Sequence, residues 1–346
     1  MTEVHRRRVL HLLGVGTGTT LLAGCSESSD DGTDPGGESS DDDGESDGEL
    51  PRYASLLPEN DESRYFYGAI DQETIAALRD DESPEDGAEP SDPLLGNPIA
   101  FTFNYYLFGL GQLADSSSFD PYRENDETDD GTGAFVFVDG VYALAGSYAF
   151  DDLRTDLEDA GYDVETDAET YAVYTDPDSG EVVGVSDEVF AFSYPNATDP
   201  DFDPVTAVER TVATAAGDRE PKHETDDEFA SLIRTGEDDG ITLCLYTTDD
   251  EFDAETLSND RSDDADGPTF EFAAFTGSTG IHQRLSIVED DVGARATSVV
   301  DYSSDDLVDE DRLESELGSD ADTVTVDRVG TTVTVDAEYA DDVADE

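Results

Sequence analysis

Beyond residue 50, apolar residues occur in short runs separated by acidic turns, a pattern typical of strands and short helices. The clearest runs, residues 135–138 and 141–144, flank the dipeptide Asp139-Gly140. Because Asp-Gly suits the two-residue type I′ turn, these runs predict a β-hairpin. The same pattern predicts further strands at residues 65–70, 99–110, 171–174, 181–185, 241–246, 269–275, 285–288, 294–302, 323–326 and 331–335.

Helical periodicity is most distinct after Asp203-Pro204. The aspartate can cap the helix, the proline fits its first turn, and Gly217 can end it. Val205, Val208 and Val212 then fall on one helical face. Shorter helices are predicted after Asp71, before Gly318 and after Asp151, the last one capped by Asp151 itself.

The second half of the chain repeats the order of strand, helix and paired strands found in the first, without a fixed period. We therefore expect an α+β protein with two similar mixed sheet-and-helix modules at residues 51–200 and 241–340. A helical connector at residues 201–240 should join them, with the helix from Asp203 bridging the modules through its valine face. The alternative is that acidic α+β chains look alike at this level of detail.

The first 24 residues differ from the rest of the chain. Three arginines, Arg6, Arg7 and Arg8, precede an apolar stretch that ends in Leu22-Ala23-Gly24-Cys25. This order is typical of an export signal, which takes no part in the mature fold. The stretch contains several glycines and threonines and is shorter than the roughly 20 apolar residues of a membrane-spanning helix.

Two motifs within this segment carry a resemblance to a known class. Arg6-Arg7-Arg8-Val9-Leu10 resembles the twin-arginine export motif, and Leu22-Ala23-Gly24-Cys25 resembles the lipobox of bacterial and archaeal lipoproteins. The resemblance implies cleavage before Cys25, lipidation of Cys25, and anchoring of the body on the extracytoplasmic face of a membrane. The alternative, an uncleaved anchor with an incidental cysteine, also places the body outside.

Residues 25–50 are expected to form the lipidated cysteine and an acidic disordered tether, because residues 26–50 lack aromatic side chains and periodicity. A coil of this length spans roughly 25–30 Å. Residues 341–346 form a short acidic tail.

Charge indicates the solvent in which the body folds. Asp and Glu number 89 against 17 Lys and Arg, which gives a formal net charge of −72. Such repulsion opposes compaction in dilute buffer, whereas at about 1 M salt the Debye length falls to about 3 Å. Because 36% of residues are hydrophobic and 9% aromatic, a folded body is favoured over disorder. The composition resembles that of extreme halophiles, which makes the chain similar to haloarchaeal lipoproteins, and its charge excludes binding to nucleic acid phosphates.

Residues suited to catalysis are scarce. After residue 24 the histidines are His223 and His282, which we expect at the surface or at a strand end, and neither belongs to a zinc-protease motif or a nucleophile elbow. With Cys25 assigned to lipid, Cys244 is expected to be a small buried apolar residue. We predict no catalytic residue, cofactor or metal site.

Three further features leave alternatives open. The acidic loops at residues 126–131 and 263–267 offer oxygen ligands for calcium but lack the EF-hand pattern, so solvation in salt is expected. Asn196-Ala197-Thr198 is a sequon, which makes Asn196 a candidate for glycosylation. The aromatic run at residues 101–108 is expected to be a strand with one face in the core, and its other face could line a groove.

Two functions fit these observations. The first is a non-enzymatic surface lipoprotein of a halophile, attached to the membrane by its lipid, that binds an unidentified protein or small molecule. The second is an extracytoplasmic hydrolase that uses carboxylates alone. A cleft holding convergent carboxylates with raised pKa values would favour the hydrolase.

The acidic composition generates a prediction about salt. Residues 51–346 should be cooperatively folded at about 1 M salt and lose structure near 0.01 M, because the Debye length grows from about 3 Å to about 30 Å. Circular dichroism along a salt titration measures the transition. An unchanged spectrum and melting temperature across that range would contradict the prediction.

Overall fold

The computed structural model describes residues 48–60, 62–80, 92–129, 131–196, 199–234, 239–249, 251–254, 257, 271–288 and 293–340. Arg6, Arg7, Arg8 and Cys25 lie outside the described residues, as do most of the expected tether, the loop at residues 263–267 and the acidic tail.

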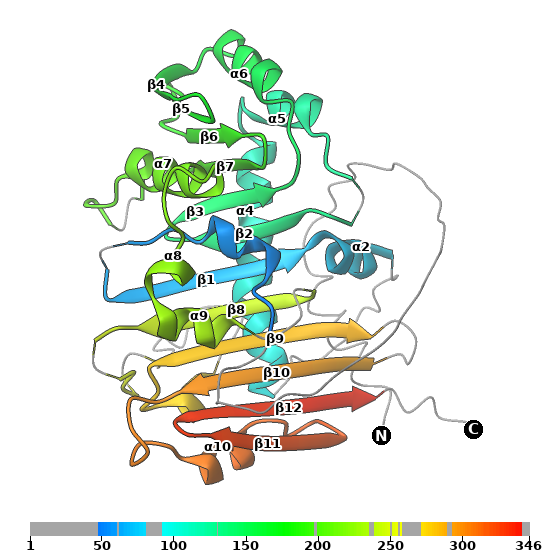
Figure 1. The fold of residues 1–346 in the computed structure, drawn as a ribbon. Helices are drawn as coiled ribbons and strands as arrows, with labels where there is room; N and C mark the ends of the chain where they lie inside the picture. Colours follow the sequence, from blue (N-terminus) through cyan, green and yellow to red (C-terminus); the bar gives the residue numbers. More distant parts are fainter. Residues whose placement is uncertain are drawn as a thin grey trace, which may run out of the picture.

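Twelve strands of the described chain form one antiparallel sheet, in the order β11-β12-β10-β9-β8-β1-β2-β3-β7-β6-β5-β4 (Figure 1). Their bounds are β1 (Arg64–Asp71), β2 (Ala134–Val138), β3 (Val141–Ala145), β4 (Asp163–Asp167), β5 (Tyr171–Thr175), β6 (Val182–Ser186), β7 (Val189–Ser193), β8 (Ile241–Thr247), β9 (Gly280–Val288), β10 (Gly293–Asp301), β11 (Thr323–Val329) and β12 (Thr332–Ala340). The chain is an α+β protein, as the sequence predicts.

The pairing of β1 with β8 joins the earlier strands to the later ones within this sheet. On each side of that pair lies a meander, β1-β2-β3 or β8-β9-β10. A helix follows the third strand in both cases, α6 (Phe150–Asp159) or α10 (Glu310–Glu316). The last strand of each half, β7 or β12, then returns to pair with the third.

Helices cover both faces of the sheet. The first face, which carries Phe135, Phe137 and Tyr142, packs against one core cluster, and the second face, which carries Val136 and Val138, packs against another. Against the first face lie α3 (Pro93–Pro98), the π-helix η2 (Ile99–Phe103), α4 (Asn104–Ala114), α5 (Phe119–Asn125), α6, α10 and the 3₁₀ turn η3 (Ala273–Phe275). Against the second face lie η1 (Arg52–Leu56), α7 (Pro204–Ala215), α8 (Lys222–Thr225) and α9 (Asp227–Ile233), whereas α2 (Gln72–Asp80) directly follows β1.

Most of the predicted strands are confirmed. The Asp139-Gly140 hairpin forms between β2 and β3, and both turn residues have positive φ, 48° and 78°, as a type I′ turn requires. The helix after Asp71 is capped by that residue, whose Oδ1 accepts a hydrogen bond from the Thr74 amide at 2.8 Å. Asp203 caps α7 in the same way. The short strands β4 and β7 are additions that the pattern did not predict.

Three local predictions are wrong. The strand expected at residues 99–110 is helical, because these residues continue a helix that begins at the Asp92 cap and Pro93. Of the strand expected at residues 269–275, residues 273–275 form a 3₁₀ turn. Asp151 does not cap α6, since the helix begins one residue earlier at Phe150.

The expected bridging helix is also different. α7 packs on β5, β6 and β7, with Val208 and Val212 fully buried, and α9 packs on β9 and β10, so residues 201–240 are divided between the two sides. The close approach of α7 depends on Gly184 in β6, where a Cβ would lie 2.6 Å from the Val208 side chain. The segment that does cross the junction is the rod formed by α3, η2 and α4, which contacts β10, β9, β8, β1 and β2 in turn.

This rod meets the central strand pair at Thr102. The Thr102 hydroxyl donates to the Thr242 carbonyl oxygen of β8 at 2.7 Å, and its side chain lies directly over Gly68 of β1. A Cβ at position 68 would lie 2.6 Å from the Thr102 Oγ1 and 2.9 Å from its methyl group. Glycine at this position therefore sets the distance between the rod and the sheet.

The crossing generates a prediction. Gly68→Ala should lower the free energy of unfolding by about 1–3 kcal/mol, because the new methyl group overpacks against Thr102 and disturbs its hydrogen bond. Gly111→Ala is the matched control, since a Cβ there meets nothing within 4 Å. It should stabilise the exposed helix by about 0.5–1 kcal/mol. Denaturant unfolding at fixed molar salt compares the two variants, and equal effects would contradict the proposed contact.

Candidate functional site

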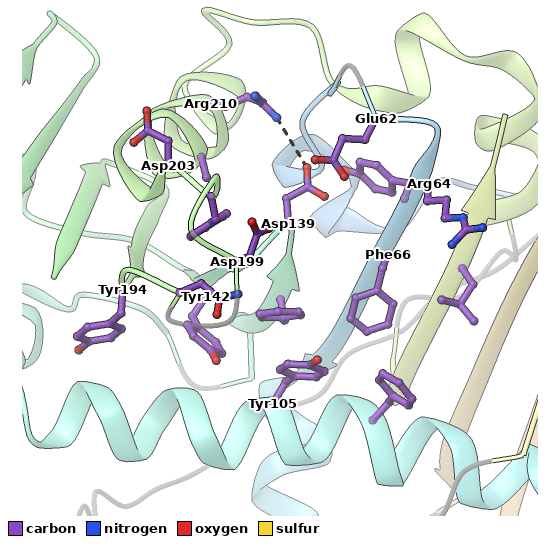
Figure 2. A pocket seen from close by; sticks show the side chains of 18 of the residues that line it. Glu62, Arg64, Phe66, Tyr105, Asp139, Tyr142, Tyr194, Asp199, Asp203 and Arg210 are labelled. Carbon is purple, nitrogen blue, oxygen red and sulfur yellow. Dashed lines mark ion pairs between the residues drawn. The ribbon is translucent and has the colours of Figure 1, made fainter. Parts of the chain in front are cut away.

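A cleft of about 1000 Å³ lies between α4, the beginning of β1, the β2–β3 turn and the loop that leads into α7 (Figure 2). Its volume matches the upper range of ligand pockets in proteins. Aromatic side chains line its floor, and charged side chains gather on the opposite side. The cleft is therefore amphipathic.

The rod supplies one wall of the cleft with a helical stripe. Phe101, Tyr105, Phe108 and Gln112 line the cleft, and their spacing of four, three and four residues places them on one helical face. The intervening Phe103 and Tyr106 are buried in the core. The aromatic run therefore contributes side chains to both the cleft and the core. Phe108 is the most exposed of them, at 58%.

The sheet extends this aromatic surface through Phe66, Phe137 and Tyr142. The Tyr105 ring stacks on Phe137, with centroids 4.0 Å apart and planes at 12°, and Phe66 contacts both rings with centroids 5.8 Å away. Burial, and then the neighbouring Tyr105, raises the pKa of Tyr142 to about 12. This hydroxyl is therefore neutral at physiological pH and presents a polar but uncharged group to the cleft.

A buried carboxylate fixes the end of the cleft nearest Tyr194. Glu181 is fully buried and accepts hydrogen bonds from the hydroxyls of Tyr194 at 2.9 Å, Ser118 at 3.0 Å and Tyr162. Burial raises the pKa of Glu181, and the three hydroxyl donors partly oppose that rise. Glu181 lies behind the lining and positions the Tyr194 ring.

The charged side of the cleft contains Glu62, Arg64, Asp139 and Arg210, together with the loop aspartates Asp199, Asp201 and Asp203. Two of the loop aspartates accept hydrogen bonds from residues close to them in sequence. Asp199 accepts from the Asp201 amide at 3.1 Å, and Asp203 accepts from the Val205 amide at 3.1 Å and the Thr206 hydroxyl at 2.7 Å.

Asp139 is the most perturbed carboxylate of the cleft. Its Oδ2 accepts a hydrogen bond from the side-chain Nδ2 of Asn60 at 2.7 Å and faces Arg210 Nη1 at 3.9 Å (Figure 2). Burial raises the pKa of Asp139 to about 6, Glu62 adds to the rise, and Asn60 and Arg210 oppose it. The sequence predicts the turn at this residue but not its surroundings, because its partners come from distant segments.

The other residues singled out in the sequence lie elsewhere, with one exception. Asn196 is exposed at the cleft, whereas residues 197 and 198 lie outside the described chain. Cys244 is a buried free cysteine in β8, as predicted. The prediction for His282 is wrong, because it lies opposite Cys244 inside the sheet at 1% exposure, where burial lowers its pKa to about 3. His223 is half-buried in α8.

Metal and membrane features can be assessed for the described residues alone. Among them, no three or more His, Cys, Asp or Glu side chains are grouped to hold a metal ion. In the loop at residues 126–131, the Asp126 Oδ1 accepts from the Thr128 amide at 3.0 Å. No helix in this part of the chain combines the length and apolar character needed to cross a membrane.

Comparison with known proteins adds little to this picture. The chain matches no protein-family model and none of the curated proteins. Among solved structures, it is similar to one described as crystal form I of TP0453, with 10% identity and a TM-score of 0.35 over 84% of this chain and 94% of that chain. Any functional conclusion therefore depends on the residues themselves.

Asp139 generates a prediction with a defined pH dependence. Above about pH 6 its carboxylate is ionised in both the folded and unfolded states, so the burial penalty is fully present. Below about pH 4 it is protonated in both states and the penalty disappears. Asp139→Asn keeps the turn and should raise the free energy of unfolding at neutral pH by roughly 1–3 kcal/mol, with the gain lost on acidification.

Denaturant unfolding at two pH values and fixed salt measures this difference. Asp159→Asn, at an exposed position in α6, is the control and should change stability little at either pH. A gain for Asp139→Asn that is equal at both pH values would mean that the turn, and not the buried charge, is responsible.

Proposed function

We propose that the protein is a membrane-tethered extracytoplasmic binding protein of a halophile, which holds an apolar ligand in the aromatic cleft. The observation that carries the proposal is the cleft itself, with one aromatic surface contributed by both the rod and the sheet. Rings held by stacking against one another form a rigid floor, which reduces the entropy lost when a ligand binds. An aromatic surface that remains open to solvent in a folded protein is typical of a binding site.

Export and anchoring to the membrane are also part of the proposal. Arg6, Arg7 and Arg8 with the sequence leading to Cys25 support export by the twin-arginine route and lipidation of Cys25. The net charge of −72 supports the proposal that the protein folds and functions in concentrated salt. A tether of about 25 residues would let the cleft stand clear of the lipid headgroups. Asn196, an exposed residue of the cleft lining, is our candidate for glycosylation.

The carboxylate hydrolase is retained as a second candidate because of Asp139. Its raised pKa and its position in the cleft beside Glu62 are features expected of a general acid. In this case Asp139→Asn should abolish turnover of a glycoside or ester substrate while leaving binding intact. Turnover by that variant equal to the wild type would exclude Asp139 as the acid.

We also propose that the halves of the sheet are two similar modules. Each consists of a three-stranded meander, a helix on the first face, and a last strand that returns beside the third. The earlier half contains four strands after its helix and the later half two. Superposition of β1, β2, β3 and α6 on β8, β9, β10 and α10 tests the proposal, and strands or helices that do not overlay in the same order and direction would exclude it.

Cleft binding is tested by a matched pair on one helix. Phe108 lines the cleft, whereas its neighbour Leu107, 40% exposed, does not. Phe108→Ala should weaken binding of an uncharged fluorescent dye such as Nile red roughly tenfold, because a large aromatic contact is lost. Leu107→Ala should leave it unchanged. Fluorescence titration at molar salt measures both, and equal losses would argue against the cleft as the binding site.

Export and lipid anchoring are tested in cells. Cys25→Ser should leave the protein uncleaved or released from the membrane, and replacement of Arg6, Arg7 and Arg8 by lysine should block export. Fractionation and mass analysis of the mature N-terminus measure these outcomes. An unmodified Cys25 in native membranes would exclude lipid anchoring at this residue.

A further inference from the structure

The charged side of the cleft contains arginine, a rare residue type in this chain, and its presence there therefore indicates what the cleft could bind. Acidic residues number 89 of 346, so carboxylates occur on every surface of this protein and say little about a ligand. Lys and Arg together number only 17. Two arginines line the cleft, Arg64 and Arg210, and they differ in their surroundings.

Arg210 already faces a carboxylate, since its Nη1 lies 3.9 Å from Asp139 Oδ2. Arg64 is exposed, and within the described chain the structure shows no ion pair or side-chain hydrogen bond for its guanidinium. An arginine of this kind presents several N–H donors in a fork that matches an acidic group.

Strand geometry places Arg64, the first residue of β1, next to the aromatic floor of the cleft. Side chains two residues apart point to the same face of a strand, about 7 Å apart, so Arg64 and Phe66 lie on one face of β1. In the register with β8, Leu245 is opposite Phe66 and Thr247 is opposite Arg64. Phe66 in turn contacts Phe101 and Tyr105 of the rod, at centroid distances of 5.4 and 5.8 Å. An apolar surface therefore extends from the guanidinium into the cleft, as Figure 2 shows for Phe66 and Tyr105.

We propose that the ligand of this cleft is an acidic amphiphile, whose carboxylate or phosphate binds Arg64 and whose apolar body lies along Phe66, Leu245 and the Phe101–Tyr105 stripe. The inference rests on the binding function proposed above. Concentrated salt makes the contact selective. With a Debye length of about 3 Å at about 1 M salt, the surrounding carboxylates repel an anion only weakly, whereas a direct hydrogen-bonded contact with arginine is retained.

Ligands with one tail and different heads test the proposal. Decanoic acid, decyl phosphate, decanol and decyltrimethylammonium, each below its micelle concentration, are titrated against Nile red bound to the folded protein in molar potassium chloride. The acids should displace the dye about tenfold more effectively than the alcohol, since a charge-assisted hydrogen bond contributes about 1.5 kcal/mol or more. The comparison of decanoic acid with decyl phosphate identifies which acidic group is preferred.

Variants assign the preference to one side chain. Arg64→Gln should remove the preference for acids while leaving decanol binding unchanged, and Arg64→Lys should retain part of it. Arg123→Gln, an exposed arginine on α5 outside the cleft lining, is the control and should behave as the wild type.

The outcomes separate the two proposals. Equal displacement by the acids and the alcohol, or a preference for the cation, would overturn the acidic ligand and leave the binding cleft standing. A protein that binds neither the dye nor any of the four ligands would overturn the proposed function itself. Loss of the acid preference in Arg123→Gln as well would overturn the assignment to Arg64.

Discussion

The contact between Thr102 and Gly68 controls the distance from the rod to the sheet at the centre of the protein. A side chain at position 68 would push the rod away, and the hydrogen bond from the Thr102 hydroxyl to β8 would be lost. Because β1 and β8 are the strands that join the two halves, this one crossing fixes the rod to both of them. The aromatic wall of the cleft begins one residue before the crossing, at Phe101, so its position depends on the same contact.

The strands could be predicted because the short apolar runs and the Asp139-Gly140 turn are local signals in the sequence. The helical rod was missed because Ile, Phe, Thr and Tyr between residues 99 and 106 favour strands intrinsically, and the helix is stabilised by packing against strands distant in sequence. The spacing of Phe101, Tyr105, Phe108 and Gln112 was the signal that could have identified both the helix and the cleft wall. The pairing of these residues with Phe66 and Phe137 depends on tertiary structure and has no local signal.

Asp139 illustrates how a residue can satisfy a local rule and conflict with its surroundings. Its backbone suits the turn, yet its carboxylate is largely buried beside Asn60 and Glu62, from the segment before β1, and Arg210, from α7. Asparagine would make the same turn without the buried charge. The ionised Asp139 therefore lowers the stability of the folded protein at a position in the cleft. Residues that lower stability in this way are typical of functional sites.

The rod has one consequence that concerns the whole molecule. It contacts strands from both halves of the sheet and also forms a wall of the cleft. A ligand that binds only the folded cleft raises the unfolding free energy through mass action. Because the wall it contacts belongs to the rod, which packs on strands of both halves, a bound ligand would stabilise both halves at once. The filled protein would melt as one cooperative unit, and local opening at the β1–β8 seam would become rarer than in the empty protein.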